Sequence, residues 1–343
     1  MEMKFYKVLS IISTKRIPDT FKVLGLIIMH ILRRRTLAVY LDPNTGCNLR
    51  CRMCYFSNPK YDKQVSFIED KKLKNVERCF YPRALKLQIG CGTEPTLYPN
   101  LNSIITKAKM SGVPFISLTT NGQLLAQKSD MLDKMILSGL NEITLSVHGF
   151  NAKTYEFLMQ GGKFEKFKNL LDVLAQLKEK NPHFSIRINF TFNYMNIVDL
   201  YPKNFWKIWS EVKPDVIQLR PVQVMGGTGW TDYDTQALGE YYDDTIGKII
   251  KDCHAFGIKI IAPEKWQLSK VDNEQGWASA AIEDVSYCYV SPTSFYKSDF
   301  LEDKDTYESY HKRKKTVSKL LLMLFYHKGR RRNASKKLNY TVK

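Results

Sequence analysis

Short apolar runs rich in β-branched and aromatic residues alternate along the chain with longer segments in which apolar residues recur every three or four positions. The short runs predict β-strands, and the longer segments predict amphipathic helices. Strands are expected at residues 36–43, 84–90, 114–120, 142–149, 184–192, 215–222 and 258–263. Helices are expected at residues 67–80, 101–112, 123–138, 163–180, 198–212 and 235–256.

This alternation predicts an α/β fold with a parallel sheet, because strand–helix–strand units connect parallel strands through right-handed crossovers. The sheet either stays open and doubly wound or curls into a partial or complete TIM-type barrel with the helices outside. In both architectures, functional groups gather at the carboxyl ends of the strands. The residues directly after each predicted strand are therefore the first candidates for chemistry.

Four segments of the chain differ in pattern. The strand–helix alternation fills residues 36–263, which we expect to form the core. Residues 264–311 are aromatic and loop-rich, and we expect them to line the open, substrate side of that core. Residues 1–35 and 312–343 are basic terminal arms.

The net charge of the chain is concentrated in these arms. The formal charge is +18; residues 1–35 contain eight Lys/Arg and two acidic residues, and residues 312–343 contain twelve Lys/Arg and no acidic residue. The residues between the arms therefore carry no net charge. The charge balance gives no reason to expect that the core itself binds a polyanion.

Each arm joins an apolar run to a cluster of basic residues. The runs in FKVLGLIIMHILRRR and VSKLLLMLFYHKGRRR are shorter than the roughly 20 residues that a membrane-spanning helix requires. The arms either contact an anionic membrane surface, pack on the core with solvated charges, or bind nucleic acid. We favour peripheral contact with the inner face of a membrane. A cytoplasmic location is expected, because the seven cysteines form no disulfide framework and no secretion signal opens the chain.

Three of the seven cysteines, Cys47, Cys51 and Cys54, are clustered directly after the first predicted strand. Their C-x3-C-x2-C spacing suits thiolate ligation of zinc or of an iron–sulfur cluster. A structural zinc site normally has four ligands, and here the fourth would have to be Cys79 or a distant histidine. A cluster held by three thiolates instead keeps one iron open for a small molecule.

The cysteine motif and three further strand-end motifs together resemble those of the radical S-adenosylmethionine (SAM) enzymes. Members of that superfamily carry C-x3-C-x2-C after the first strand and a Gly-Gly-Glu-Pro-like motif after the second, where this chain has GCGTEP. They commonly have Thr-Asn-Gly after the third strand and Ser-x-His-Gly after the fourth, here LTTNG and LSVHG. The chain resembles a single-cluster member, because two later cysteines, Cys253 and Cys288, are too few for a cysteine-rich auxiliary-cluster domain.

The resemblance implies a radical SAM barrel and a 4Fe-4S cluster on Cys47, Cys51 and Cys54 whose open iron binds SAM. It also implies an oxidoreductase, reduced by a partner such as flavodoxin or ferredoxin, that cleaves SAM to a 5'-deoxyadenosyl radical. This radical would abstract hydrogen from a substrate C–H bond. Thr93 departs from the glycine usual at its position, and its side chain narrows the approach to SAM. By the same resemblance, the SAM-binding residues are Met53, Tyr55, Gly92, Thr93, Glu94, Asn121, Ser146 and Asn189.

Two more residues are candidates for catalysis. His148 follows the fourth strand and is interpreted as a donor to SAM, a proton carrier or a polar residue of a turn. Cys288 lies in the aromatic segment. Some radical SAM epimerases use a late cysteine to return a hydrogen atom to the substrate, and a buried structural thiol is the alternative.

No strand-end motif defines the substrate. The main hypothesis is epimerisation or another modification of a lipid-linked, saccharide or peptide substrate. The alternatives are an RNA-modifying radical SAM enzyme and a non-catalytic scaffold stabilised by zinc.

Overall fold

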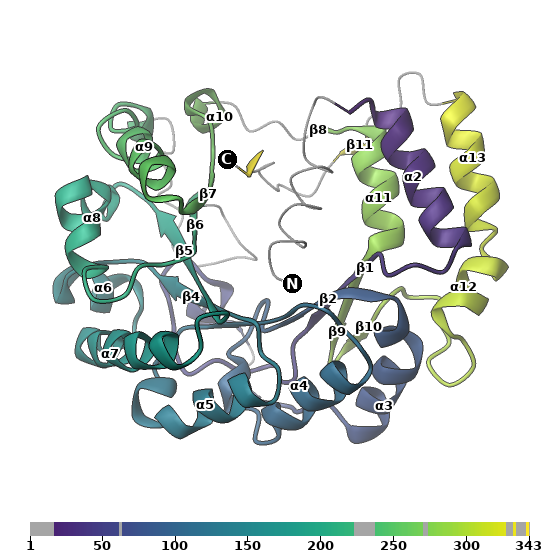
Figure 1. Ribbon diagram of the computed structural model, residues 1–343, viewed down its shortest axis with the longest axis horizontal. Coiled ribbons are helices and arrows are strands. Elements are labelled where there is room, and N and C mark those ends of the chain that lie inside the picture. Colours follow the sequence, from purple (N-terminus) through teal and green to yellow (C-terminus); the bar gives the residue numbers. More distant parts are fainter. Residues whose placement is uncertain are drawn as a thin grey trace.

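The computed structural model describes residues 17–61, 64–222, 237–269, 274–326, 332–333 and 341–342. Its main feature is a ten-stranded sheet in the order β10-β9-β1-β2-β3-β4-β5-β6-β7-β12. Neighbouring strands from β9 to β7 are parallel, whereas β10 and β12 (Thr341–Val342) pair in the antiparallel direction at the two edges. The sheet curls without pairing its edges, so the fold is a partial (β/α) barrel (Figure 1).

The strands occupy the positions predicted by the hydrophobic pattern. They are β1 (Leu37–Leu41), β2 (Ala84–Ile89), β3 (Ile116–Thr120), β4 (Glu142–Val147), β5 (Ser185–Phe192), β6 (Val216–Pro221) and β7 (Lys259–Ala262). The helices on the outer face are α3 (Asp70–Cys79), α4 (Leu101–Met110), α5 (Ser129–Leu137), α6 (Ala152–Leu158), α7 (Phe164–Lys180), α8 (Pro202–Ile208) and α9 (Ile246–Phe256). A short pair of strands, β8 (Glu274–Gln275) and β11 (Arg332–Asn333), and the helix α10 (Lys265–Ser269) lie outside this sheet.

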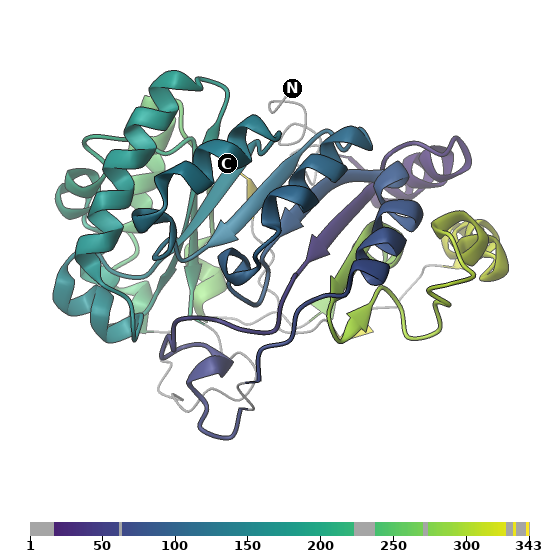
Figure 2. The same ribbon diagram turned by 90° about the horizontal axis from the view of Figure 1, so that it is seen from below.

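The core lies between the sheet and the helices that surround it (Figures 1 and 2). Side chains alternate between the two faces of a strand, so every second residue points outward to the helices. Leu87, Ile143 and Ile188 point this way and are fully buried. Their neighbours on the inner face, such as Gln88, Thr144 and Asn189, are polar, and Asn189 lines the pocket at the barrel mouth.

Gly90 allows the chain to turn sharply after β2. Its φ of +81° lies in the left-handed region, which residues with a side chain rarely adopt. A Cβ atom at this position would lie 2.4 Å from the carbonyl oxygen of Thr119. Glycine is therefore required where the β2 loop crosses the end of β3.

The prediction that residues 264–311 are loop-rich is wrong. This segment forms α11 (Trp277–Ser286), β9 (Tyr287–Ser291) and β10 (Ser294–Phe295), and α12 (Tyr307–Arg313) begins within it. Strand β9 joins the sheet beside β1, with Cys288 paired to Val39. Strand β9 is short, and its partner β1 is distant in sequence. The pattern of apolar and polar residues near β9 was therefore not enough to predict a strand there.

The two terminal arms meet at one end of the sheet. The first contains α2 (Asp19–Ile31), and the second contains α13 (Thr316–Tyr326). Helix α2 packs against both α11 and α13, and Figure 1 shows the three helices side by side. In the described part of the chain, no helix has the length and apolar character needed to cross a membrane.

A buried histidine links these helices and makes their packing sensitive to acid. His311 of α12 shares hydrogen bonds with Tyr296 Oη through Nε2 (2.8 Å) and with Thr316 Oγ1 through Nδ1 (2.8 Å). Burial lowers the pKa of His311 to about 3, and the adjacent His30 lowers it further. Asp284 opposes this shift, whereas Lys297 and Arg83 add to it.

We expect the His311 contribution to stability to be complete above pH 6.5 and to fall as the pH drops from 6.5 toward 3. The unfolded chain binds the proton that the folded state rejects, which costs about 2 kcal/mol at pH 5. Thermal unfolding of His311→Gln at pH 7 and pH 5 checks this, because glutamine cannot titrate. The variant should lose less stability between the two pH values than the unmodified protein, and an equal loss would contradict the assignment.

Candidate active site

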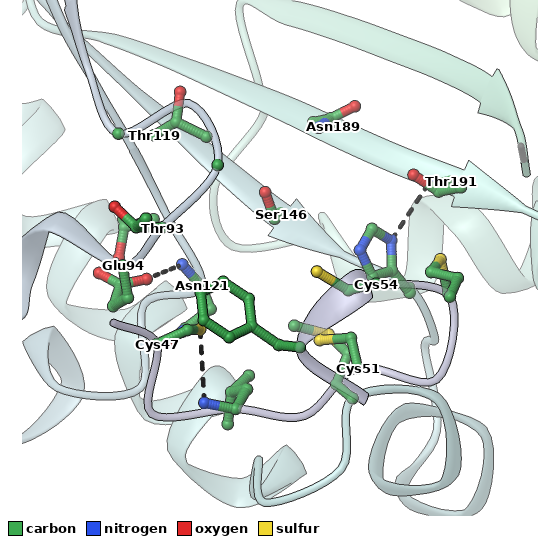
Figure 3. Close-up of a pocket in the computed structure, with 18 of the residues that line it drawn as sticks. Cys47, Cys51, Cys54, Thr93, Glu94, Thr119, Asn121, Ser146, Asn189 and Thr191 are labelled. Carbon is green, nitrogen blue, oxygen red and sulfur yellow. Dashed lines mark hydrogen bonds between the residues drawn. The ribbon is translucent and has the colours of Figure 1, made fainter. Parts of the chain in front are cut away.

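The carboxyl ends of β1 to β6 surround a pocket in the barrel mouth. All three clustered cysteines reach it, and so do all eight predicted SAM-binding residues and His148. Figure 3 shows the cysteines on one side of the pocket, with Ser146, Asn189 and Thr191 across from them. The structure thus brings together residues that lie as far apart in sequence as Cys47 and Val222.

The loop that carries the cysteines is anchored to neighbouring segments through its backbone. The N–H groups of Arg50 and Arg52 donate to the carbonyl oxygens of Gln160 (2.8 Å) and Leu158 (2.9 Å), just after and at the end of α6. Within the loop, the Cys54 N–H donates to the Cys51 carbonyl at 2.9 Å. This turn places Cys51 and Cys54 on the same side of the pocket (Figure 3).

The three thiols lie close enough to affect one another. Burial raises the pKa of Cys47 to about 12. Burial also raises the pKa of Cys51, and the neighbouring Cys47 and Cys54 raise it further. The thiols therefore keep their protons until a metal replaces them, as expected for ligands whose binding releases protons. Among the described residues, no three His, Cys, Asp or Glu side chains form a site for a single metal ion.

Donors approach Cys47 from two sides. The Leu49 N–H lies 3.4 Å from Cys47 Sγ, and Asn121 Nδ2 lies 3.9 Å from the same atom. Asn121 Nδ2 also donates to Asn48 Oδ1 at 2.8 Å. Hydrogen bonds to sulfur stabilise its anionic form, so this arrangement suits a thiolate ligand.

Asp42 does not line the pocket but holds the loop that does, and the sequence patterns did not reveal this role. It directly follows β1 and is fully buried. Its Oδ1 accepts hydrogen bonds from the Cys91 N–H (2.6 Å) and from Thr93 Oγ1 (3.2 Å), and its Oδ2 accepts one from the Gly92 N–H (3.1 Å). Tyr289 Oη of β9 donates to Oδ2 at 2.8 Å. The only available signal was an acidic residue at a strand end, in the sequence YLDP.

Gly92 has little free space around its Cα atom. A Cβ atom at Gly92 would lie 3.2 Å from Tyr55 Oη and 3.5 Å from Asp42 Oδ2. Tyr55 Oη also donates to the Gly92 carbonyl at 2.6 Å. Tyr55 therefore supports the β2 loop from the cysteine side of the pocket. The side chain of Thr93, at a position where the resemblance predicts glycine, donates a hydrogen bond to Asp42.

Glu94 is buried and holds two strand-end loops together. Its Oε1 accepts hydrogen bonds from Thr96 Oγ1 (2.5 Å), from the Thr96 N–H (3.2 Å) and from Thr120 Oγ1 (2.7 Å). Its Oε2 accepts one hydrogen bond, from the Asn121 N–H at 2.8 Å. Burial raises the pKa of Glu94, and these donors oppose the shift. Oε1 already accepts three hydrogen bonds, whereas Oε2 accepts one and can accept another from a further donor.

The far wall of the pocket presents polar side chains from β4 and β5. Ser146 and Asn189 are direct neighbours across these strands. Asn189 Oδ1 is buried and has no hydrogen-bond partner among the described residues. An unpartnered buried acceptor is costly, so the pocket is suited to a ligand that supplies a hydroxyl or N–H group at this point.

His148 is held as a neutral donor. Its Nδ1 accepts a hydrogen bond from the Thr191 N–H at 3.2 Å, which leaves the ring proton on Nε2. Burial lowers the pKa of His148 to about 3, and the charge of Arg220 lowers it further. A ring with this pKa stays uncharged at neutral pH, which favours the hydrogen-bond donor over the proton carrier among the roles considered for it.

Cys288 does not reach the pocket. Its side chain is fully buried in the hydrophobic core, on the face of β9 that packs against the helices. The expectation that Cys288 lines the open end is therefore corrected, because alternation along β9 directs Tyr289 to the mouth and Cys288 away from it. Cys253 is likewise buried, on α9, and does not line the pocket.

The chain is similar to known proteins over the same region that builds the pocket. Residues 41–194 match the model of the radical SAM superfamily. A probable GTP 3',8-cyclase of Saccharolobus solfataricus is 28% identical over 61% of this chain and 66% of its own length. A GTP 3',8-cyclase of Chlorobaculum tepidum is 26% identical over 44% of this chain and 43% of its own. The chain thus spans less than two thirds of the length of these relatives.

The fold is shared with a solved structure. Streptococcus suis SuiB bound to S-adenosylmethionine superposes with a TM-score of 0.59 over 82% of this chain and 68% of that chain, at 13% sequence identity. The superfamily uses a 4Fe-4S cluster and SAM, and the three thiols and the unpartnered Asn189 acceptor suit such a pair of cofactors. The ordered strand-end motifs, the partial barrel and the family match agree: residues 41–194 form a radical SAM domain, and the chain is an enzyme.

Proposed function

We propose that the pocket holds a 4Fe-4S cluster on Cys47, Cys51 and Cys54, with SAM beside it, and that the enzyme abstracts hydrogen from a substrate C–H bond. The observation that best supports this proposal is that the three thiols line one pocket together with Asn189, whose amide oxygen has no hydrogen-bond partner among the described residues. Bound there, the two cofactors supply an electron and a 5'-deoxyadenosyl radical. A flavodoxin or ferredoxin would deliver the electron.

The protein's part is to position SAM and to exclude water. Glu94 Oε2 retains an acceptor site for the amino group of SAM, and the Asn189 acceptor suits a ribose hydroxyl. The neutral His148 offers its Nε2–H as a donor. Met53 is buried at the pocket wall with Leu158 and Val222, and this apolar group suits the adenine ring. Such fixed partners hold a reactive species in place while solvent stays outside.

Two classes of substrate are candidates for this pocket. The relatives named GTP 3',8-cyclase make GTP the first substrate to assay, and Arg220 at the pocket wall offers a positive charge for an anionic group. A lipid-linked, saccharide or peptide substrate, modified by epimerisation or a related reaction, is the second candidate. The buried position of Cys288 argues against that residue as the hydrogen donor of an epimerase.

One anaerobic experiment tests the proposal. The chain is reconstituted with iron and sulfide, and its iron, sulfide and zinc contents are measured. Dithionite and SAM are then added, with and without GTP, and 5'-deoxyadenosine is quantified. We expect about four irons per chain, because the thiols serve one cubane cluster. Close to eight irons would overturn the single-cluster proposal, and stoichiometric zinc with intact SAM would overturn the proposed function.

A further inference from the structure

Helices α2 and α13 expose apolar side chains that are not buried in the core. The inner face of α2 is buried through Val23, Leu26, Ile27 and His30. Beyond the first turn, which carries the exposed Asp19 and Thr20, its opposite face is also apolar and is exposed through Leu24, Ile28 and Ile31. We call the following set the arm surface: Phe21, Leu24, Ile28, Ile31 and Leu32 of the first arm, and Leu321, Leu322 and Phe325 of α13, all of them exposed.

The exposed fractions of these side chains are large for apolar residues. Phe21 is 64% exposed, Ile28 is 48% exposed and Phe325 is 78% exposed. Single exposed apolar residues are common, but a contiguous group marks an interaction site. Here the exposed apolar residues come from two helices near opposite ends of the chain, α2 and α13, which pack on each other (Figures 1 and 2).

Basic side chains accompany the apolar ones. Arg33 and Arg34 follow Leu32, which caps the end of α2, whereas Lys315 precedes α13 and Lys319 lies in its first turn. All four are exposed, and none of them has an acidic partner among the residues that the structure describes. Their charges are therefore available to an external anion.

We propose that the arm surface docks on an anionic lipid bilayer, with the apolar side chains in the interface and the basic side chains on the lipid headgroups. Helices that combine an apolar face with basic residues bind membrane surfaces in this way. Pairing with a second copy would instead place the basic side chains of Arg33, Arg34 and Lys319, which have no acidic partner among the described residues, at an apolar interface without supplying an anion for them. An RNA would use the charges but leave exposed leucine and phenylalanine side chains in water.

Vesicle flotation of the full chain tests this proposal. The vesicles contain phosphatidylcholine alone or phosphatidylcholine with phosphatidylglycerol, each at low and high salt. We expect the unmodified protein to float with the anionic vesicles and to be released by salt. Ile28→Glu/Phe325→Glu should bind at least about tenfold more weakly, because each change places a charge in the interface.

A matched double variant controls for the added charge. Met110 and Leu137 are also exposed apolar residues, at 82% and 77%, but lie at the ends of α4 and α5. Met110→Glu/Leu137→Glu should bind vesicles like the unmodified protein, and all variants should show unchanged thermal unfolding. The following results would each overturn the proposal: no flotation with anionic vesicles, equal flotation of Ile28→Glu/Phe325→Glu, retention by RNA but not vesicles, or a dimer that this variant converts to monomer.

Discussion

Replacing Cys51 by alanine is expected to abolish 5'-deoxyadenosine formation and to remove most of the iron. Cys51 is partly buried, and Cys47 and Cys54 lie close enough to raise the pKa of its thiol. Two thiolates are too few to hold a cubane cluster. The measurement is iron and sulfide content together with 5'-deoxyadenosine after anaerobic addition of dithionite and SAM.

Cys91→Ala is the matched control. Cys91 also lines the pocket, but it belongs to the β2 loop and is not one of the three clustered cysteines. Its replacement should leave the iron content unchanged and most of the 5'-deoxyadenosine formation in place. If Cys91→Ala lost the cluster while Cys51→Ala kept it, the ligand set proposed for this pocket would be wrong.

Asp42→Asn is expected to raise the apparent KM for SAM at least about tenfold while the iron content stays normal. The carboxylate of Asp42 accepts from the Cys91 and Gly92 N–H groups, from Thr93 Oγ1 and from Tyr289 Oη. An amide replaces one acceptor atom by a donor, and a buried donor left without a partner costs about 1–3 kcal/mol. The loop predicted to contact SAM then loses its fixed shape.

Tyr289→Phe provides a graded comparison for Asp42→Asn, because it removes only one of these hydrogen bonds. Its effect on the KM for SAM should be smaller and in the same direction. Titration of SAM against initial rates of 5'-deoxyadenosine formation measures both variants. An unchanged KM in Asp42→Asn, with normal cluster content, would show that the β2 loop keeps its shape without this carboxylate.

The sequence by itself determined the strands of the barrel and the location of the site. The hydrophobic pattern is local, so β1 to β7 were found within a few residues of their observed bounds. Parallel strands bring their carboxyl ends to one edge, which is why strand-end motifs predicted a shared pocket. Cys47, Cys51 and Cys54 lie in one loop, so their proximity also required no long-range information.

The tertiary structure decided what depends on contacts between distant segments. Tyr289 and Asp42 are 247 residues apart, and only the pairing of β9 with β1 brings them together. The same pairing directs Cys288 into the core, whereas its neighbours Tyr287 and Tyr289 lie on the other face of β9. The two arms became one surface because α2 and α13 pack on each other. Burial and packing are properties of the assembled fold, and a local pattern of residue types does not contain them.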